Sequence, residues 1–276
     1  MNVMVISNAR PKIHGPKANR KIFSLRYTLC AIRWAMRPII LIPARLAATR
    51  LPNKPLLPIA GKPMIEHVYA GAQASKLGAV CVAAGDQEIV DHIRGIGGQA
   101  VLTDPDLPSG SDRIWAALQT VDPAGQYDTI INLQGDLPKI APDLLVQILR
   151  LLDNPAVDIA TAVTPIADPA DIAKPNVVKA ALALHGPAAG RALYFSRSAI
   201  PHGAAVFYHH IGIYIYKRPA LARFITAPPA DLELTEKLEQ LRALALGLRI
   251  DAAIVNEVPL TIDTPEDLER ARRMMG

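Results

Sequence analysis

Short β-rich apolar runs alternate with segments of helical periodicity through the first half of this chain of 276 residues. The runs have the length and composition of buried strands, and the segments between them have the period of amphipathic helices. Strands are expected at 39–42, 80–83, 100–102 and 129–133, and helices at 64–77, 87–96 and 112–121. Helices on both sides of one sheet bury the apolar faces of such elements. The pattern therefore predicts an α/β fold with a doubly wound, mostly parallel sheet.

The second half of the chain follows a less regular pattern. Strands are expected at 158–163, 177–184, 191–196, 209–216 and 250–255, and helices at 142–152, 218–226, 235–246 and 265–275. No Pro-, Gly- or Ser-rich linker separates two apolar regions. We therefore expect a single domain over residues 36–276, with a small sub-lobe around 165–230.

The net charge of +5 is unevenly distributed along the chain. Residues 1–37 hold eight of the 30 basic residues and no Asp or Glu, which leaves 22 basic against 25 acidic residues in the remainder. We interpret residues 1–35 as a basic N-terminal extension outside the fold and expect them to be poorly ordered. Because the remainder is mildly acidic, we expect no nucleic-acid partner.

The sequence carries no signal for secretion or membrane insertion. Arg26 and Arg33 interrupt the apolar stretch at 25–36, which lacks the continuous core of a signal peptide. No apolar run has the length needed to cross a bilayer. Cys30 and Cys81 are far apart and have no partner at metal-ligand spacing, so neither a disulfide nor a zinc site is expected. These features fit a cytoplasmic protein.

A cationic loop follows the first apolar run. Pro43 ends the expected strand, and the loop then carries Arg45, Arg50, Lys54 and Lys62 without an acidic residue. In an open α/β sheet, ligands bind at the carboxyl ends of the strands. Cations and free backbone N–H groups at that place suit a polyphosphate, although four scattered cations alone also fit a solvated surface loop.

Two carboxylates are expected at the same edge of the sheet. Asp136 follows the strand at 129–133, and Gly135 before it allows close backbone approach. Asp263 is expected to end another short strand ahead of the helix at 265–275. Carboxylate oxygens are the ligands that Mg²⁺ prefers, and Mg²⁺ commonly shares phosphate oxygens. The pair therefore predicts a magnesium–triphosphate site, whereas Asp263 by itself is also typical of the acid at a helix N-terminus.

Several motifs resemble those of the CMP-sugar-acid synthetases, and especially of the 3-deoxy-D-manno-octulosonate (KDO) cytidylyltransferase, or CMP-KDO synthetase, family. The loop residues R-x-x-x-x-R-L-P-x-K-P resemble the signature R-x-x-S-x-R-L-P-G-K-P, QGDLP resembles Q-G-D-E-P, and TIDTPEDLERAR resembles G-V-D-T-P-E-D-L-E-R-x-R. Further similar segments are PSGSDR, KPNVVK, ALYFSRSAIP, HHIGIYIY and TEKLEQLRAL. The resemblance runs from about Met36 to the C-terminus and implies a nucleotide-diphospho-sugar transferase-like, Rossmann-like fold.

The resemblance also implies roles for particular residues. Catalysis falls to Arg45, Lys54, Asp136 and Asp263, of which the two Asp residues bind Mg²⁺. The nucleotide-binding residues are Ala44, Arg45, Lys54, Ser109, Gly110 and Arg113. The residues around the sugar acid are Arg50, Gln134, Arg197, His210, Tyr214, Glu239 and Gln240. From the residues alone, His210 and Tyr214 share one strand face and equally fit a core or edge position.

The family implies a cytoplasmic homodimer that makes CMP-KDO and pyrophosphate from CTP and KDO, for lipopolysaccharide biosynthesis. One alternative is a sister synthetase for sialic acid or an amino variant of KDO. Another is a nucleotidyltransferase for a different nucleotide and a sugar phosphate, whose usual Gly-rich first loop is absent here. The third is a non-catalytic paralogue that binds a nucleotide, against which the presence of both Asp residues argues.

The chain departs from the family pattern at a few positions near the expected site. Ala48 and Asn53 stand at the usual Ser and Gly of the loop, Leu137 at the usual Glu of Q-G-D-E-P, and Lys174 at the usual Asn before Pro175. After the second strand the family has A-T-D, where this chain has Ala83, Ala84 and Gly85, with Asp86 one residue later. These changes are expected to alter the sugar pocket or nucleotide binding.

Overall fold

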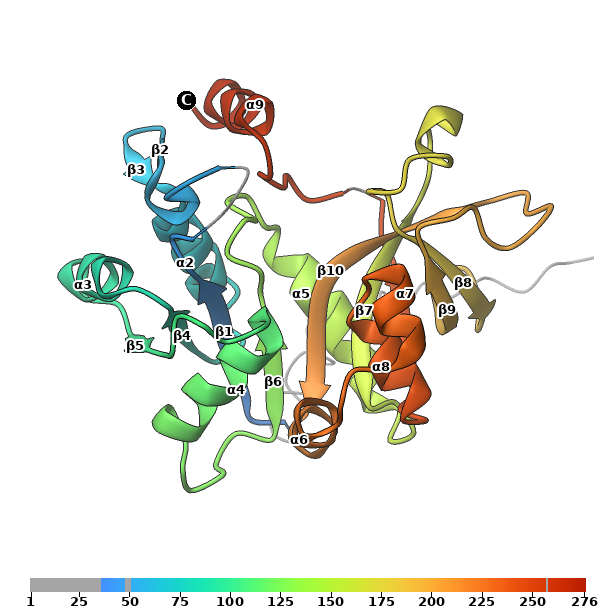
Figure 1. Ribbon diagram of the computed structural model, residues 1–276, viewed down its shortest axis with the longest axis horizontal. Coiled ribbons are helices and arrows are strands. Elements are labelled where there is room, and N and C mark those ends of the chain that lie inside the picture. The colour runs from blue at the N-terminus through green and yellow to red at the C-terminus, as the bar shows by residue number, and fades with distance from the viewer. Residues whose placement is uncertain (1–35, 48–50, 257) are drawn as a thin grey trace, which may run out of the picture.

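A nine-stranded sheet forms the centre of the protein in the computed structural model, which describes residues 36–47, 51–256 and 258–276 (Figure 1). In spatial order the strands are β5 (Ala100–Leu102), β4 (Ala79–Ala84), β1 (Pro38–Ala44), β6 (Thr129–Asn132), β10 (Tyr208–Lys217), β7 (Ile159–Pro165), β11 (Ile250–Ile254), β9 (Ala189–Ser196) and β8 (Lys179–Leu184). Strands β5, β4, β1 and β6 are parallel. Strand β10 runs antiparallel to both β6 and β7, and β11 is parallel to β7.

Helices cover both faces of this sheet, as the alternating sequence pattern predicts (Figure 1). One face carries α2 (Met64–Ala74), α3 (Gln87–Gly95) and α5 (Pro142–Leu149), and the other carries α4 (Gly110–Val121), α6 (Arg218–Thr226) and α8 (Gln240–Ala245). In β1, Ile40 and Ile42 pack into the first core and Ile39 and Leu41 into the second, because successive side chains of a strand point to opposite faces. The predicted fold class is confirmed.

A third, smaller core joins the C-terminal helix to the segment at residues 51–64. Helix α9 (Pro265–Met275) packs on the hairpin of β2 (Pro58–Ile59) and β3 (Lys62–Pro63), with Ile59, Ile262 and Leu268 buried between them. The side chain of Thr264 caps α9 by accepting from the backbone N–H of Asp267. This packing fixes residues 262–264 beside the loop that follows β1.

The helix predicted at 235–246 is two short helices, α7 (Asp231–Glu236) and α8. Lys237 between them adopts the left-handed conformation, with φ 56° and ψ 46°. Tertiary contacts stabilise the break, because the Glu236 carboxylate accepts from Ser196 Oγ and from the backbone N–H of Arg197. The remaining short elements are three 3₁₀ turns, η1 (Lys54–Leu56), η2 (Arg150–Asp153) and η3 (Pro169–Asp171).

Two further expectations concern parts of the chain outside the sheet. The N-terminal extension at 1–35 lies outside the described residues. Among the residues that the structure describes, no helix combines the length and the apolar character that crossing a membrane requires.

Candidate active site

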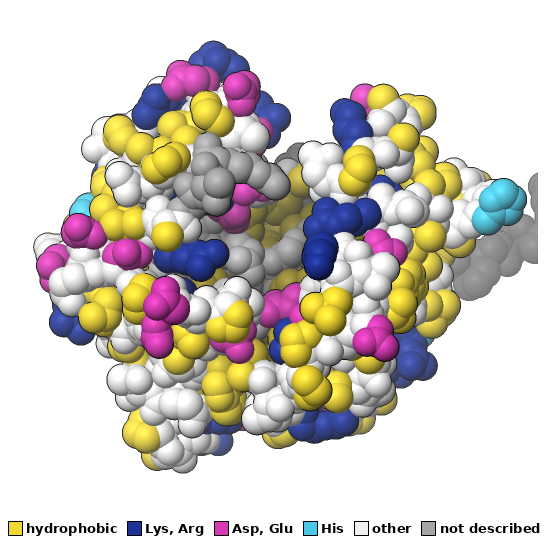
Figure 2. All heavy atoms as spheres, viewed as in Figure 1, with side chains coloured by type: hydrophobic (Ala, Val, Ile, Leu, Met, Phe, Trp, Pro, Cys, Tyr) yellow, Lys and Arg dark blue, Asp and Glu magenta, His cyan; other side chains and the backbone are white. Residues whose placement is uncertain are grey.

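A cavity of about 300 Å³ lies where β1 and β6 end and α4 begins. Its wall includes all the residues predicted for the nucleotide, which are Ala44, Arg45, Lys54, Ser109, Gly110 and Arg113. It also includes the predicted metal ligand Asp136 and Gln134, which is predicted for the sugar acid. This is the carboxyl edge of the parallel strands, where ligands of open α/β sheets bind. In the view of Figure 2 the molecule is hollowed between the side of α9 and the side of β8 and β9, and basic side chains gather on both walls.

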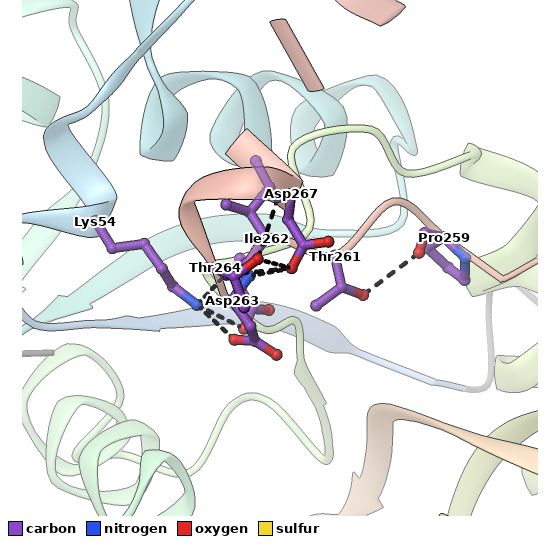
Figure 3. A network of polar contacts seen from close by, with 8 residues as sticks. Lys54, Pro259, Thr261, Ile262, Asp263, Thr264 and Asp267 are labelled. Carbon is purple, nitrogen blue, oxygen red and sulfur yellow. Dashed lines mark hydrogen bonds and ion pairs between the residues drawn. The ribbon is translucent and has the colours of Figure 1, made fainter. Parts of the chain in front are cut away.

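Lys54 joins the two predicted metal ligands. Its Nζ donates to Asp136 Oδ2 at 3.0 Å, to Asp263 Oδ1 at 3.0 Å and to the carbonyl of Ile262 at 2.7 Å (Figure 3). Lys54 begins the 3₁₀ turn η1, and Asn53 before it has φ 57°. Asn tolerates this left-handed conformation better than most residues, which explains how it replaces the family's glycine. The structure thus brings Lys54, Asp136 and Asp263 together.

The segment that brings Asp263 to the site is not the strand that was predicted. Residues 259–263 are not a strand of the sheet, and Leu260 makes only an isolated bridge to Lys139. The backbone N–H of Ile262 donates to the carbonyl of Asp136 at 3.1 Å, so the segment before α9 is held against the loop after β6. The prediction of a strand end at Asp263 was wrong, and the convergence results from the packing of α9.

Gly135 has the role that its place in the sequence suggests. A Cβ at this position would lie 2.7 Å from the carbonyl oxygen of Pro43, closer than real Cβ contacts allow. Glycine therefore lets the loop after β6 pass the end of β1 and carry Asp136 into the site. The next residue, Leu137, is 4% exposed and packs in the core, so a site-adjacent acid is absent from this position.

The electrostatics of the acid pair suit a cation. Burial raises the pKa of Asp136 above its ordinary value, and the neighbouring Lys54 charge lowers it by less than burial raises it. Burial also opposes the charge of Lys54, but Asp136 and Asp263 outweigh it and the pKa of Lys54 is raised. The side chain of Asp263 is half exposed. Two carboxylates at an open edge fit Mg²⁺. The described part of the chain offers no third His, Cys, Asp or Glu ligand beside them. Water and phosphate oxygens would therefore complete the coordination shell of the ion.

Arg113 is a buried residue in the wall of the cavity. It is 2% exposed, and its guanidinium donates to Thr103 Oγ1 at 2.6 Å and to the carbonyls of Asp104 and Pro105 at 2.9 and 3.0 Å. Burial, followed by the nearby charge of Arg45, lowers the pKa of Arg113. Ser109 caps α4, so the positive end of this helix faces the cavity.

The residues predicted for the sugar acid lie on two groups of elements. Gln134 lines the cavity, and its Nε2 donates to Asn132 Oδ1 at 3.3 Å. Arg197, His210, Tyr214, Glu239 and Gln240 lie on β9's end, β10 and the start of α8. Arg50 falls outside the described residues.

The Arg197 guanidinium is held by backbone carbonyls. It donates to the carbonyls of Glu236 at 2.7 Å, Pro175 at 3.0 Å and Lys237 at 3.1 Å. No salt bridge of the Arg197 side chain is found among the described residues. Carbonyls orient a guanidinium without neutralising it, so its charge remains available to an anion.

A buried polar cluster beneath the site joins the predicted Glu239 to Ser111, Asn132 and Tyr216, which were not predicted. Ser111 Oγ donates to Glu239 Oε2 at 2.8 Å, and Ser111 and Asn132 are 2% and 1% exposed. Burial raises the pKa of Glu239, and it also raises that of Tyr216, whose hydroxyl contacts Ser111 and Asn132. A signal was available, because Asn132 is a polar residue that directly follows the apolar pair Ile130 and Ile131 in a fully buried strand.

His210 is a buried neutral imidazole. It is 8% exposed, packs edge-on against Phe195 and has Nε2 3.0 Å from Thr161 Oγ1. The Thr161 hydroxyl donates its proton to the carbonyl of Ile213 at 2.8 Å, so it accepts a hydrogen bond from His210 Nε2–H. Burial lowers the pKa of His210 to about 3 from its usual 6.5.

This pKa predicts an acid-sensitive fold. Because the folded-state pKa of His210 lies below the unfolded value of 6.5, its contribution is complete above pH 6.5 and is lost as the pH falls toward 3. The free energy of unfolding should fall by about 1.4 kcal/mol per pH unit below 6.5 on account of this residue. Urea unfolding at pH 7 and pH 5 should show His210→Gln losing about 2 kcal/mol less than the parent between these pH values. The exposed His202→Gln serves as the control, and equal losses in His210→Gln and parent would contradict the prediction.

Comparison with known proteins finds relatives that match most of this chain. The model of the cytidylyltransferase family matches residues 39–250. The 3-deoxy-manno-octulosonate cytidylyltransferase of Paramagnetospirillum magneticum is 52% identical over 241 residues, which cover 87% of this chain and 98% of that protein. The protein of the same name from a Bradyrhizobium species is 53% identical over 238 residues, covering 86% and 97%.

A solved structure of CMP:2-keto-3-deoxy-manno-octonic acid synthetase complexed with CTP superimposes with a TM-score of 0.80 at 38% identity. The match covers 87% of this chain and 98% of that one. The matches to the two sequence relatives and to this structure cover nearly the whole length of each of those proteins. The chain therefore belongs to the cytidylyltransferase family and, within it, to the 3-deoxy-manno-octulosonate cytidylyltransferases.

Proposed function

We propose that this protein transfers CMP from CTP to KDO, with release of pyrophosphate, in the synthesis of lipopolysaccharide. The observation that carries the proposal is the convergence of Lys54, Asp136 and Asp263 at a cavity whose wall also holds Arg45 and Arg113. The high identity to cytidylyltransferases over most of the chain supports the same reaction. The CTP complex of a related synthetase supports CTP as the nucleotide.

The reaction is a direct displacement at the α-phosphorus of CTP. The anomeric hydroxyl oxygen of KDO forms the new O–P bond, the bond between the α-phosphorus and its bridging oxygen breaks, and pyrophosphate leaves. Lys54 and Arg45 bind the phosphates and hold them in line with the hydroxyl. Asp136 and Asp263 would hold Mg²⁺, which when bound supplies electrostatic stabilisation of the phosphate charge. Ser109, Gly110 and Arg113, with Ala44, bind the nucleoside end.

The second substrate is bound by the residues of β10, α8 and the end of β9. Arg197 binds the sugar carboxylate, and Gln134, Tyr214, Glu239 and Gln240 hydrogen-bond the hydroxyl groups. His210 takes part as a neutral imidazole, in keeping with its lowered pKa, and its Nδ1 can accept a hydrogen bond because Nε2–H is donated to Thr161. We further propose that residues 36–276 form the catalytic domain, with residues 1–35 outside it, that the protein is a homodimer and that it works in the cytoplasm. Arg50 completes the sugar-acid set.

Substrate choice is tested by measuring pyrophosphate release over the four nucleoside triphosphates and a panel of sugar acids. CTP with KDO should be the preferred pair, and turnover of a sialic acid or amino-KDO without turnover of KDO would instead indicate a sister synthetase. Arg197→Ala should raise the KM for KDO about 10- to 100-fold, because a charge-assisted hydrogen bond contributes roughly 1.5–3 kcal/mol. The KM for CTP should change little.

The matched control for this substitution is Arg191→Ala, an exposed arginine on the same strand β9. It should leave both KM values unchanged. A larger rise in the KM for CTP than for KDO in Arg197→Ala would place Arg197 on the nucleotide side and contradict its proposed role.

A further inference from the structure

The backbone on either side of Arg45 is held by two consecutive residues at the end of β4. The N–H of Gly85 donates to the carbonyl of Ala44 at 2.8 Å, and the N–H of Leu46 donates to Asp86 Oδ2 at 2.7 Å. These two hydrogen bonds lie on both sides of the one residue, Arg45, whose side chain lines the cavity. Residues at the end of β4 therefore fix the backbone of Arg45, and with it the direction in which the Arg45 side chain points.

Asp86 hydrogen-bonds Leu46 instead of capping the helix α3 that follows it. It stands at the residue before α3 with an extended backbone, φ −137° and ψ 141°, the usual position of a helix cap. Its side chain nevertheless accepts no hydrogen bond from the first turn of α3. The carboxylate is used instead on an N–H group 40 residues away in the sequence.

Gly85 explains why the acid stands one residue later than in the family pattern. A Cβ at Gly85 would lie 2.8 Å from Arg113 Nη1 and 3.2 Å from the Cβ of Arg45. Both arginines therefore pack against the bare backbone of Gly85, and an Asp side chain at that position would displace them. With Gly at 85, the carboxylate of Asp86 reaches the loop after β1 from the next position.

Asp86 orients Arg45 without neutralising it. No ion pair between Asp86 and either arginine is found in the described ranges, although the charge of Asp86 is near enough to act on Arg113. The side chain of Arg45 likewise makes no hydrogen bond or ion pair with another described residue. Its charge is therefore free for an anionic ligand in the cavity.

We propose that Asp86 is a positioning residue for nucleotide binding, which holds the N–H of Leu46 so that Arg45 points at the phosphates of CTP. The proposal rests on the proposed function only in taking CTP as the ligand. In this chain Gly85 and Asp86 together would position the nucleotide-binding arginine, whereas the family pattern has an acid at position 85.

The test compares two substitutions in calorimetric titrations with CTP and Mg²⁺, in the absence of a sugar acid. Asp86→Asn removes the charge but keeps an oxygen that can accept from Leu46, and it should bind CTP at least as tightly as the parent. Asp86→Ala removes both, and it should bind CTP up to about tenfold more weakly than Asp86→Asn, since a neutral hydrogen bond to the N–H of Leu46 is worth up to about that factor. Glu88→Ala, exposed on α3, is the matched control and should leave binding unchanged.

The second comparison uses an Arg45→Ala background. If Asp86 acts through Arg45, Asp86→Ala should have no further effect on CTP affinity in that background. Equal affinity of Asp86→Ala and Asp86→Asn would overturn the proposal, and so would an undiminished effect of Asp86→Ala without Arg45. If the melting temperature shows that Asp86→Ala is unfolded, Asp86→Ser replaces it, because its hydroxyl can cap α3 but is one bond shorter toward Leu46. Turnover of CTP with KDO by the parent reports the proposed function separately from these binding measurements.

Discussion

Asp136→Asn and Asp263→Asn should each lower kcat at least about a hundredfold. Each substitution keeps the size of the side chain and removes one of the two negative charges that Lys54 joins. The metal would then bind less tightly, and the phosphates would lose part of the charge stabilisation that the reaction needs. Groups of this kind contribute roughly 2.7–4 kcal/mol to the transition state, which corresponds to the expected loss. Steady-state pyrophosphate release at low millimolar Mg²⁺ is the measurement.

The same substitutions should leave the melting temperature nearly unchanged. Because burial holds the pKa of Asp136 above its ordinary value, its charged form already costs free energy in the fold at neutral pH, and Asn removes that cost. In either variant Lys54 keeps the other carboxylate and the carbonyl of Ile262 as partners.

The controls are Asp143→Asn and Glu266→Gln, exposed acids at the first turns of α5 and α9. They should retain full activity, and removal of Mg²⁺ by a chelator should abolish the activity of the parent. Near-normal kcat in either Asp136→Asn or Asp263→Asn would contradict the assignment of the acid pair.

Lys179→Met should destabilise the fold strongly, because Lys179 is a fully buried lysine. Lys179 is 0% exposed, and its ammonium donates to the carbonyls of Lys174 at 3.0 Å, Val177 at 2.6 Å and Arg197 at 2.5 Å. An ammonium has three donors, and here each meets one carbonyl. Methionine fills the volume of the lysine stem but leaves the three carbonyls without this donor.

The expected loss is the difference between two opposing effects. An unsatisfied buried acceptor costs about 1–3 kcal/mol, whereas removal of a buried charge returns some desolvation free energy. Burial, followed by the charge of Arg197, lowers the pKa of Lys179, which shows that this desolvation is appreciable. We expect a net loss of about 2–4 kcal/mol in the free energy of unfolding. The melting temperature should fall by roughly 5–15 °C for a domain of this size.

Calorimetric melting of Lys179→Met beside Lys174→Met measures this effect. Lys174 is exposed, and its side chain pairs with the partly exposed Asp171 in the same loop, so its loss should change the melting temperature by no more than about 2 °C. A melting temperature of Lys179→Met equal to that of the parent would show that the three carbonyls do not depend on the ammonium.

The sequence alone determined those features that depend on neighbours within a few residues. The bounds of α6 and α9 agree with the predicted 218–226 and 265–275, because Pro near the first turn and, for α9, the Thr264 cap are local signals. The alternation of apolar runs and helical periods was sufficient for the fold class, since each element must bury its own apolar face. The motifs also identified the acid pair and the cationic loop.

Only the tertiary structure decided how these residues meet. Lys54 and Asp263 are 209 positions apart, and the packing of α9 on the β2–β3 hairpin brings them into contact rather than a strand of the sheet. The break between α7 and α8 at Lys237 depends on contacts of Glu236 with β9, which no local pattern contains. Hydrogen bonds within a helical turn can be inferred from local sequence, but a carboxylate such as Asp86 has several possible donors, and only the packed chain selects the N–H of Leu46.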